Sequence, residues 1–444
     1  MKKVWIYFHR DFTSTWVDTG ILEEISKHFN VTVLTSENLK LDYSKIQNNV
    51  IKFNDSRGIW VYEKLIELKQ VENRYMSKSF TFRLNRFFFG NLVVTRENLI
   101  EHPTILIKKL SHMINYIKSH KLQPLFYFSL IRKIFILISN FYLKKYLAHI
   151  GSVLQFDLLI IPSSGIEPKV FKMIDFCAKN QLKTLLAVEN WDNLTSKSML
   201  ISLPNYLSVM GEHCKRHALS MYKLNSEDIL INGLPRFDKF YEYKFNKTNN
   251  NSNKKIIMYL GFSVPHNEYQ LINFLVKNLE AQLGPNSFSF IYRPHPARQK
   301  RFFEDTLQDN PHLSINNPTV SSSNYLPEIG ERYFRELEDV DLVIATPTTM
   351  ALEAIMLNIP FVIDGTNDGI HKTTAGCSLS NYTHLLDLKQ TINKWIASDM
   401  EDLLNLIFKR LATPNSGSLV DITKIINIEN IYSKGLVDFI KQKL

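Results

Sequence analysis

Short apolar runs alternate with longer amphipathic stretches along most of the chain. A buried parallel strand is a near-continuous run of Val, Ile, Leu and aromatic residues, whereas a helix repeats its apolar positions every three or four residues. These patterns predict a first series of strands at Val4–Phe8, Val31–Leu34, Leu158–Ile161, Thr184–Val188, Tyr206–Met210 and Ile229–Ile231. A second series is predicted at Ile256–Leu260, Phe288–Tyr292, Leu342–Ala345 and Phe361–Ile363.

Helical patterns separate these strands. They cover Thr19–Phe29, Pro168–Lys179, Glu268–Leu283, Glu328–Glu338 and Thr349–Leu357. Strands that alternate with helices build parallel sheets with helices on both faces. The tract NKTNNNSNKK, residues 246–255, is polar and indicates a linker between the two series. The sequence therefore predicts an α/β protein of two doubly wound, Rossmann-like domains facing a central cleft: residues 1–245, a linker at 246–254, and residues 255–444.

One region departs from this alternation and predicts a basic helical insert at about residues 80–150. Between residues 102 and 156 there is no Asp or Glu, but there are eight Lys and Arg residues. Residues 125–143 are strongly apolar, and two charges in the middle of this stretch argue against a membrane-spanning helix. At 100° per residue one stripe of the helix carries Ser129, Arg132, Lys133, Ser139 and Asn140. The segment is either an interfacial helix attracted to anionic lipid, or a helix packed into the first domain with its basic stripe in solvent or lining the cleft.

Composition places the chain among soluble globular proteins of two or three domains. It has 444 residues, of which 45% are hydrophobic and 22% charged. Cys177, Cys214 and Cys377 are far apart, which favours a reducing compartment over a disulfide framework or a zinc site. The first apolar run, VWIYF, is short for a secretion signal. A cytoplasmic protein is expected, either free or peripheral at the inner face of the membrane.

The charge is unevenly distributed between the two predicted domains. Residues 1–250 hold 35 Lys and Arg against 22 Asp and Glu, whereas residues 251–444 hold 18 against 21. A basic half beside a mildly acidic half indicates two domains with different partners. The basic residues are not accompanied by a base-stacking motif or a recognition helix, so a nucleic-acid partner is not expected.

The segment DLVIATPTTMALEAIMLNIPFVIDG, residues 341–365, predicts a strand, a Thr/Pro turn, a helix from about Thr349 and a second strand. Thr346, Thr348 and Thr349 lie where the helix begins, and free backbone N–H groups and the helix dipole favour a phosphate there. Glu353 lies one turn further on, where a carboxylate can accept both hydroxyls of a ribose. The alternatives are simple N-capping for the threonines and a solvated helix position for Glu353.

This segment resembles the nucleotide-binding motif in the C-terminal domain of GT-B glycosyltransferases. In that motif a Ser/Thr turn precedes a helix carrying a glutamate, and a small-residue/Pro step leads into the next strand. Thr348, Thr349, Glu353 and Pro360 hold the matching places, and Asn358 stands where a glycine is common. The resemblance implies a GT-B fold and a nucleotide-sugar donor held by this segment.

The segment IYRPHPARQK, residues 291–300, predicts a strand that runs into an extended turn fixed by two prolines. Arg293 and His295 then come to the carboxyl edge of the sheet, where open α/β sheets bind ligands. A guanidinium and an imidazole suit a diphosphate or a phosphodiester. The alternative is a capped strand end with surface charges.

This second segment resembles the HP signature of bacterial GT-B sialyltransferases, polysialyltransferases and Kdo transferases, where it is paired with a downstream Ser/Thr motif. By that resemblance His295 contacts the phosphate of a CMP-sugar. An R-x-H-P motif also occurs in CDP-glycerol glycerophosphotransferases. Those enzymes usually carry Asp-Tyr-Ser-Ser where this chain has ATPTT at 345–349, and this departure favours the first group.

Polar side chains also follow the strands of the first domain. AVENWDNLTSK, residues 187–197, resembles a segment of bacterial capsule and surface-polysaccharide transferases. The loop at 8–20 reaches the same edge, as does NGLPRFDKF at 232–240. The latter resembles the G-x-P-R-x-D stretch that ends the first domain of such proteins, with a simple turn as the alternative. The predicted acceptor-binding residues are His9, Arg10, Trp191, Asn193, Lys197 and Arg236.

An inverting transferase needs a base that deprotonates the acceptor hydroxyl. A carboxylate does this when burial raises its pKa. The candidates, unranked, are Asp11, Asp18, Glu189 and Asp192, with His9 behind them. Asp11 and Asp192 equally suit loop-capping roles.

Small residues at the start of the second domain predict close approach of the donor phosphate. Gly261 and Ser263 follow its first strand. Asp364 and Asp368 lie in a later loop, where they either contact the sugar or belong to an ordinary loop. The sequence contains no Gly-rich dinucleotide fingerprint, P-loop, HExxH or DxD-centred metal site. Neither a cofactor nor a required metal is therefore expected.

Together these features predict a GT-B glycosyltransferase that builds bacterial capsule, lipopolysaccharide or another surface polysaccharide. The second domain is expected to hold a nucleotide-activated sugar, with a CMP-linked acidic sugar favoured, and the basic first domain a glycan or lipid-linked acceptor. The alternatives are a CDP-glycerol-type polyol-phosphate transferase, a UDP-sugar 2-epimerase on the same scaffold, and a catalytically inactive GT-B scaffold protein. An epimerase leaves the basic insert unexplained, and Arg293, His295 and Glu353 argue against an inactive scaffold.

Overall fold

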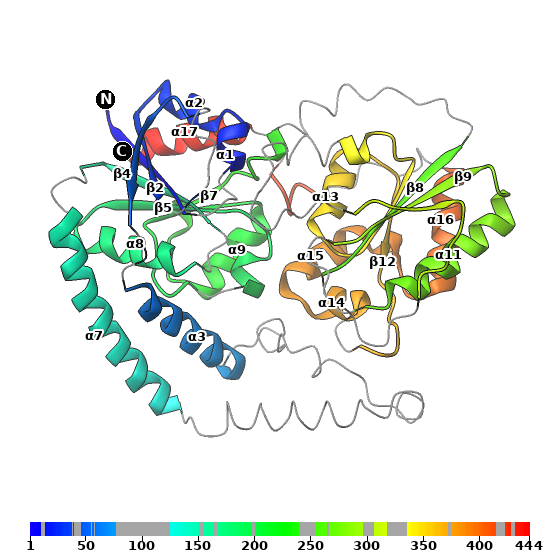
Figure 1. Cartoon of the computed structure of the whole chain (residues 1–444), viewed down its shortest axis with the longest axis horizontal. Helices are drawn as coiled ribbons and strands as arrows, with labels where there is room; N and C mark the ends of the chain where they lie inside the picture. Colours follow the sequence, from blue (N-terminus) through cyan, green and yellow to red (C-terminus); the bar gives the residue numbers. More distant parts are fainter. Residues whose placement is uncertain are drawn as a thin grey trace.

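Two parallel sheets with helices on both faces form the molecule, which confirms the predicted α/β architecture (Figure 1). The computed structural model describes residues 1–9, 14–37, 39, 46–54, 56, 58–76, 125–150, 155–163, 167–197, 200–238, 254–263, 266–295, 306–317, 335–371, 374–413, 422–427 and 431–444.

The first sheet has seven strands in the order β3-β2-β1-β4-β5-β6-β7. Their bounds are β1 Lys3–Phe8, β2 Asn30–Ser36, β3 Asn49–Phe53, β4 Leu158–Ser163, β5 Lys183–Val188, β6 Tyr206–Val209 and β7 Ile229–Ile231. The second sheet has six strands in the order β10-β9-β8-β11-β12-β13. Their bounds are β8 Lys255–Leu260, β9 Phe288–Arg293, β10 Leu313–Ile315, β11 Leu342–Ala345, β12 Phe361–Asp364 and β13 Ile396–Ala397.

Each sheet reverses its strand order beside its first strand. In the first sheet β1 lies between β2 and β4, and in the second β8 lies between β9 and β11. Because neighbouring strands are parallel, their carboxyl ends gather at one edge, and ligands of open α/β sheets bind there. Three strands were not predicted from the sequence patterns, and all three are end strands: β3 in the first sheet, and β10 and β13 in the second.

Helices cover both faces of the first sheet (Figure 1). On one face lie α1 (Ser14–Asp18), α2 (Ile21–Ser26) and α17 (Tyr432–Lys443), and on the other α3 (Ile59–Met76), α7 (Leu125–Ile150), α8 (Pro168–Lys179) and α9 (Glu212–Met221). The alternation of side chains along β1 explains this layering. Val4 and Ile6 pack with α2 and α17, whereas Trp5 and Tyr7 pack with α3 and α8.

The second sheet is covered in the same way. One face packs against α11 (Glu268–Leu283) and α16 (Met400–Ala412), and the other against α13 (Thr349–Met356), α14 (Ala375–Asn381) and α15 (Thr383–Ile392). Short 3-10 turns at Ser226–Asp228 and Asn393–Trp395 precede strands, and a π turn spans Asn193–Lys197. Of the helix predicted at Glu328–Glu338, residues 335–338 are helical, and the rest lies outside the described residues.

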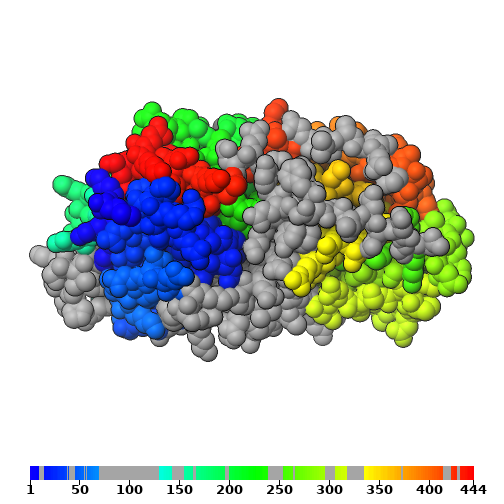
Figure 2. Space-filling view, turned by 90° about the horizontal axis from the view of Figure 1, so that it is seen from above, coloured from blue at the N-terminus to red at the C-terminus, as the bar shows by residue number. Residues whose placement is uncertain are grey.

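The end of the chain returns to the first sheet. In Figure 2 the C-terminal residues, coloured red, lie against the blue N-terminal ones. Before α17, residues 422–427 also contact the first unit, because Asn427 N donates to Met210 O and His213 N to Lys424 O. Gly211 permits this approach, since a Cβ built there would lie 2.0 Å from a backbone oxygen. The predicted division into 1–245 and 255–444 does not anticipate this return.

One hydrophobic cluster runs through both units. It joins Val209 and Phe237 of the first unit to Leu352 and Ile363 of the second. The two units therefore rest on each other through packed side chains. We call the surface where they meet the junction, and the polar contacts that cross it define the candidate site.

Candidate functional site

Side chains from the carboxyl ends of both sheets meet at the junction. The polar contacts across it pair Arg236 with Glu353, Asn190 with Thr349, Thr195 with His384 and Arg216 with Asp387. Two of these four contacts end on α13, the helix that the sequence predicted to bind the donor nucleotide. The first unit thus directly touches the predicted donor site.

The three threonines before α13 have different surroundings. Thr346 is fully buried, and its hydroxyl donates to Leu260 O at 2.9 Å. The Thr349 hydroxyl donates to Asn190 Oδ1 across the junction at 3.0 Å. Thr348 is the N-cap residue, yet its side chain makes no capping bond, and its buried hydroxyl has no hydrogen-bond partner among the described residues. The hydroxyl of Thr348 is therefore a hydrogen-bonding group without a capping role at the helix N-terminus.

Glu353 is buried at the junction and is not the solvated helix residue of the alternative interpretation. It is 1% exposed, and Arg236 Nε donates to its Oε1 at 2.9 Å. Its other oxygen, Oε2, is buried and has no hydrogen-bond partner in the described parts of the chain. Burial raises the pKa of Glu353, while the positive charges of Arg236 and Arg293 oppose this rise. An unsatisfied buried carboxylate oxygen is costly, and ligand hydroxyls would satisfy it.

Arg293 ends the strand β9, and His295 follows it two residues later, at the carboxyl edge of the sheet. Arg293 is 3% exposed, and its Nε donates to a carboxylate oxygen of Glu336. Gly261 brings the two strand ends together, because its N–H donates to Arg293 O and an added Cβ would lie 3.0 Å from His295 N. The small residue thus admits the turn that carries His295, and Ser263 two residues later is exposed.

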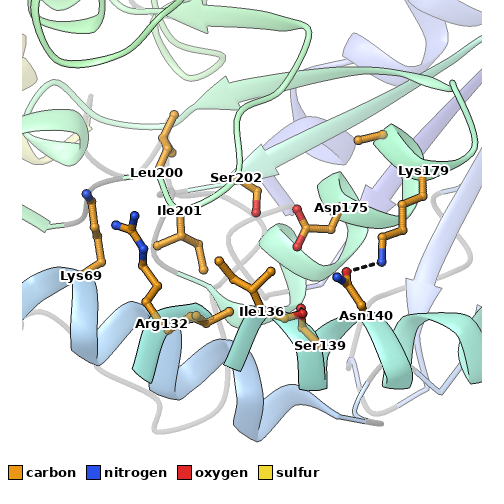
Figure 3. A pocket seen from close by; sticks show the side chains of 12 residues that line it. Lys69, Arg132, Ile136, Ser139, Asn140, Asp175, Lys179, Leu200, Ile201 and Ser202 are labelled. Atoms are coloured by element: carbon orange, nitrogen blue, oxygen red, sulfur yellow. Dashed lines mark hydrogen bonds between the residues drawn. The ribbon is translucent and has the colours of Figure 1, made fainter. Parts of the chain in front are cut away.

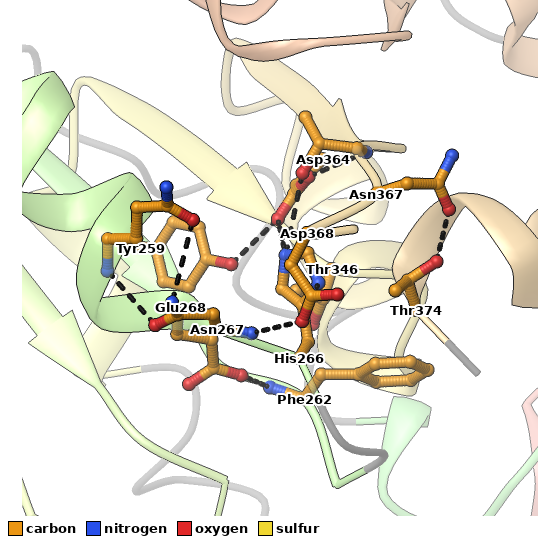
Figure 4. A network of polar contacts seen from close by, with 12 residues as sticks. Tyr259, Phe262, His266, Asn267, Glu268, Thr346, Asp364, Asn367, Asp368 and Thr374 are labelled. Carbon is orange, nitrogen blue, oxygen red and sulfur yellow. Dashed lines mark hydrogen bonds and ion pairs between the residues drawn. The ribbon is translucent and has the colours of Figure 1, made fainter. Parts of the chain in front are cut away.

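A buried polar network supports the loops after β8 and β12 (Figure 4). Asp364 is fully buried, and it accepts hydrogen bonds from the Tyr259 hydroxyl at 2.7 Å and from Thr366 N at 2.9 Å. His266 Nε2 lies 3.3 Å from the same carboxylate. Burial alone would lower the pKa of His266, but Asp364 and Asp368 outweigh it and raise that pKa. The network positions these loops, and Asp364 is not exposed toward a sugar.

Asp368 anchors the loop that follows β12. Its carboxylate accepts hydrogen bonds from the backbone N–H groups of Asn267, Ile370 and His371, and it lies 2.7 Å from His371 Nδ1. Burial would raise the pKa of Asp368, but these partners lower it to about 2. Glu268 likewise accepts from Phe262 N. Within the described ranges no group of three His, Cys, Asp or Glu side chains is placed to hold a metal ion.

In the first unit, a histidine and a carboxylate follow the adjacent strands β1 and β4. His9 Nε2 lies 3.9 Å from Glu167 Oε2, and both side chains are buried. Neither ring nitrogen of His9 has a hydrogen-bond partner among the described residues. The hydroxyl of Ser163 donates to Glu167 Oε2 at 2.5 Å. Glu167 was not among the predicted site residues, although it follows a predicted strand just as His9 does.

The aromatic stretch after β5 is part of the junction itself. Trp191 is 3% exposed, and its ring lies edge-on to His384 and His213, with centroids 5.5 and 6.3 Å away. Asn193 is 1% exposed, and neither amide atom has a hydrogen-bond partner within the described chain. Burial lowers the pKa of His213 to about 3. Trp191 thus packs the two units together, and both amide atoms of Asn193 are buried beside it.

The remaining predicted site residues are only partly placed. Glu189 and Asp192 are half-buried beside Trp191, and Glu189 N donates to Ser163 O at 3.2 Å. Asp18 is half-buried at the end of α1, and Lys197 is the last residue of the π turn. Arg10 and Asp11 lie outside the described residues.

No protein-family model and no curated protein matches the chain. Among solved structures, the putative UDP-N-acetylglucosamine 2-epimerase from Listeria monocytogenes aligns with 100% of this chain and 97% of its own, at TM-score 0.53 and 11% identity. The Methanocaldococcus jannaschii UDP-GlcNAc 2-epimerase, in complex with UDP-GlcNAc and UDP, covers 100% of both chains at TM-score 0.46 and 13% identity. The calicheamicin glycosyltransferase CalG4 covers 99% and 98% at TM-score 0.45 and 6% identity. At such identities the Listeria match shows that the chain has the two-sheet GT-B fold.

Proposed function

We propose that this chain is a nucleotide-sugar-dependent GT-B glycosyltransferase of bacterial surface-polysaccharide synthesis, acting on a glycan or lipid-linked acceptor. The observation that carries the proposal is the pair of buried polar atoms on α13, Thr348 Oγ1 and Glu353 Oε2, which have no hydrogen-bond partner among the described residues. A hydroxyl at a helix N-terminus is a donor for phosphate, and a carboxylate accepts from ribose hydroxyls. A nucleoside phosphate offers both partners, a phosphate oxygen for the Thr348 hydroxyl and ribose hydroxyls for the Glu353 carboxylate.

The positive groups near this helix suit a leaving nucleotide. Arg293 lies close enough to Glu353 to oppose the rise of its pKa, and it ends the strand that carries His295. As the bond between sugar and phosphate breaks, negative charge develops on the phosphate, and Arg293, His295 and the α13 N-terminus stabilise it. The resemblance of the HP and Ser/Thr motifs favours a CMP-linked acidic sugar as the donor.

On the acceptor side, the proposed base lies among His9, Glu167 and Glu189. These residues follow the adjacent strands β1, β4 and β5, whose carboxyl ends lie side by side. An imidazole with a carboxylate 3.9 Å from one nitrogen can take the proton of an acceptor hydroxyl and share its charge with the carboxylate. Replacing His9 with Gln should therefore abolish transfer and leave nucleotide binding intact. Loss of nucleotide binding in this variant would contradict the assignment.

Calorimetric titration of the full chain with CMP, CDP, UDP and GDP tests the donor class. Selective binding of CMP supports the proposal, whereas CDP selects a CDP-glycerol-type phosphotransferase. UDP or GDP would indicate a hexose donor. If no nucleotide binds at millimolar concentration, the proposal fails and an inactive GT-B scaffold remains.

Thr348→Val tests the site itself, because it removes an unpartnered hydroxyl at almost constant volume. We expect unchanged stability and a nucleotide affinity about fivefold weaker, the worth of one hydrogen bond of ~1 kcal/mol. Thr391→Val is the matched control, since the Thr391 hydroxyl donates to the backbone oxygen of Asp387 within α15. If Thr348→Val binds the nucleotide as tightly as Thr391→Val does, Thr348 does not contact the nucleotide.

A second candidate is a UDP-sugar 2-epimerase, because the Listeria protein that shares the fold is described as a putative UDP-N-acetylglucosamine 2-epimerase. Such an enzyme needs acid–base groups at the sugar but no acceptor. Incubation of the chain with UDP-GlcNAc alone distinguishes the two. Incorporation of solvent deuterium at C2 would favour the epimerase, and its absence together with CMP binding would favour the transferase.

A further inference from the structure

Helix α7 presents three different faces to its surroundings. Phe135, Ile138 and Tyr142 pack against the core of the first unit. Arg132, Ile136, Ser139 and Asn140 line a cavity between α7, α3 and α8. A third face points outward and carries Leu130, Ile134, Leu137 and Phe141, which are 48%, 46%, 68% and 57% exposed. We call these four residues the α7 stripe.

The α7 stripe is an unusual surface for a globular protein. The four side chains follow the i, i+4, i+7, i+11 spacing of one helix face, so their apolar surfaces are contiguous. Trp60 of α3 is 45% exposed, and its ring lies 6.1 Å from the rings of Phe135 and Tyr142. A contiguous exposed apolar patch of this kind marks an interaction site.

The cavity beside the stripe is basic. It has a volume of about 530 Å³, and cations from three helices line it: Lys69 of α3, Arg132 of α7 and Lys179 of α8 (Figure 3). Lys179 Nζ donates to Asn140 Oδ1 at 2.5 Å. Asp175 is the one carboxyl group among the residues that line this cavity; burial raises its pKa, and it accepts a hydrogen bond from the Tyr62 hydroxyl at 3.0 Å. The cavity thus has the charge and the donors to hold a phosphate group.

We propose that the α7 stripe and this basic cavity dock on an anionic phospholipid bilayer. The stripe enters the boundary between headgroups and acyl chains, and the cavity takes a lipid phosphate. An interfacial helix combines an apolar face with flanking Lys and Arg, and Trp lies at headgroup depth. The exposed Lys133 lies next to the stripe on α7, Arg132 lies on the cavity side of the helix, and Trp60 packs on the rings of Phe135 and Tyr142.

Charge favours a bilayer over a second copy of the chain as the occupant. The stripe and the cavity carry Lys69, Arg132, Lys133 and Lys179 against one carboxyl group, that of Asp175. Two copies meeting on this face would bring like charges together, whereas anionic lipid attracts each cation. Among the described residues no helix is long and apolar enough to cross a membrane. The docking is therefore an in-plane contact of α7, and it does not depend on the proposed function.

Sedimentation of the full chain with vesicles of phosphatidylcholine, with and without phosphatidylglycerol, tests the proposal. We expect binding to the mixed vesicles only, weakened by high salt. Leu137→Ser with Phe141→Ser should lower the partition coefficient about tenfold or more. Arg132→Gln with Lys133→Gln should lower it roughly fivefold for each charge.

Lys277→Gln with Lys441→Gln is the matched control, because it removes two exposed charges elsewhere and should leave vesicle binding unchanged. Thermal unfolding midpoints of all variants show whether each one is folded. Nucleotide titrations of the same variants test the proposed function separately from vesicle binding. Equal binding to neutral vesicles, or full binding by the stripe variant, would overturn the proposal. So would self-association of the lipid-free protein that the stripe variant abolishes.

Discussion

Removing Arg236 should destabilise the protein in a pH-dependent way. Its guanidinium is 2.9 Å from a Glu353 carboxylate that is 1% exposed, while the Arg236 side chain is 18% exposed. Removing one partner of a buried pair costs about 3–5 kcal/mol. Because Arg236 is partly solvated and Arg293 also acts on Glu353, we take the lower end, ~3 kcal/mol at pH 8, for Arg236→Met.

The burial of Glu353 determines how the stability loss in Arg236→Met depends on pH. Without Arg236, burial raises the pKa of Glu353 further above its value in the unfolded chain. The folded variant then holds a proton that the unfolded chain releases, so its free energy of unfolding decreases as pH rises through the folded pKa. The loss caused by Arg236→Met should therefore be smaller at pH 5 than at pH 8.

Urea unfolding at pH 5 and pH 8 measures this for the wild type, Arg236→Met, Glu353→Gln and the double variant. A neutral Gln leaves no uncompensated charge, so the double variant should lie within about 1 kcal/mol of Glu353→Gln alone. Equal losses at the two pH values would refute the reasoning. Simple addition of the two single-variant losses would also refute it.

Two further predictions concern the parts of the fold that support the site. Asp364 and Asp368 raise the pKa of His266 in the folded protein above its unfolded value of about 6.5. The free energy of unfolding of the wild type should therefore fall above pH 6.5, by up to about 1.4 kcal/mol per pH unit. Urea unfolding at several pH values should show a flatter slope for His266→Gln. Gly211→Ala places a Cβ 2.0 Å from Ile425 O and should cost roughly 2 kcal/mol by thermal unfolding, with faster proteolysis after residue 421. Lys223→Ala, at an exposed position just after the helix that Gly211 precedes, is its control, and an equal cost would contradict the packing argument.

Local signals were enough to predict the helices whose ends are chemically marked. The bounds of α8 and α11 match the predictions, because Pro168 starts α8, the Asn267 side chain caps α11 and Gly284 ends it. Strands buried on both faces were also recognised. The missed strands have weak patterns: β3 is largely half-exposed and β13 has two residues. Neither offers the apolar run that marks a central strand.

The candidate site was predictable in its elements but not in its pairings. The turn before α13 and the end of β9 follow from strand ends in the sequence. Arg236 and Glu353 are 117 positions apart and belong to different units, so no local pattern joins them. Periodicity likewise placed Arg132, Ser139 and Asn140 on one stripe of α7. It could not indicate that this stripe faces a cavity and that apolar residues face outward, because that depends on what packs against the helix.

The pairings also explain how the two units act on one ligand. Arg236 donates to one oxygen of Glu353, and Asn190 accepts from Thr349, so the first unit fixes two side chains of the helix that carries the proposed donor site. A ligand hydroxyl that binds Oε2 of Glu353 would interact with the same negative charge that attracts Arg236 to Oε1. At the proposed site, nucleotide affinity and contact between the units would therefore be thermodynamically linked, and each would change the other by the same factor.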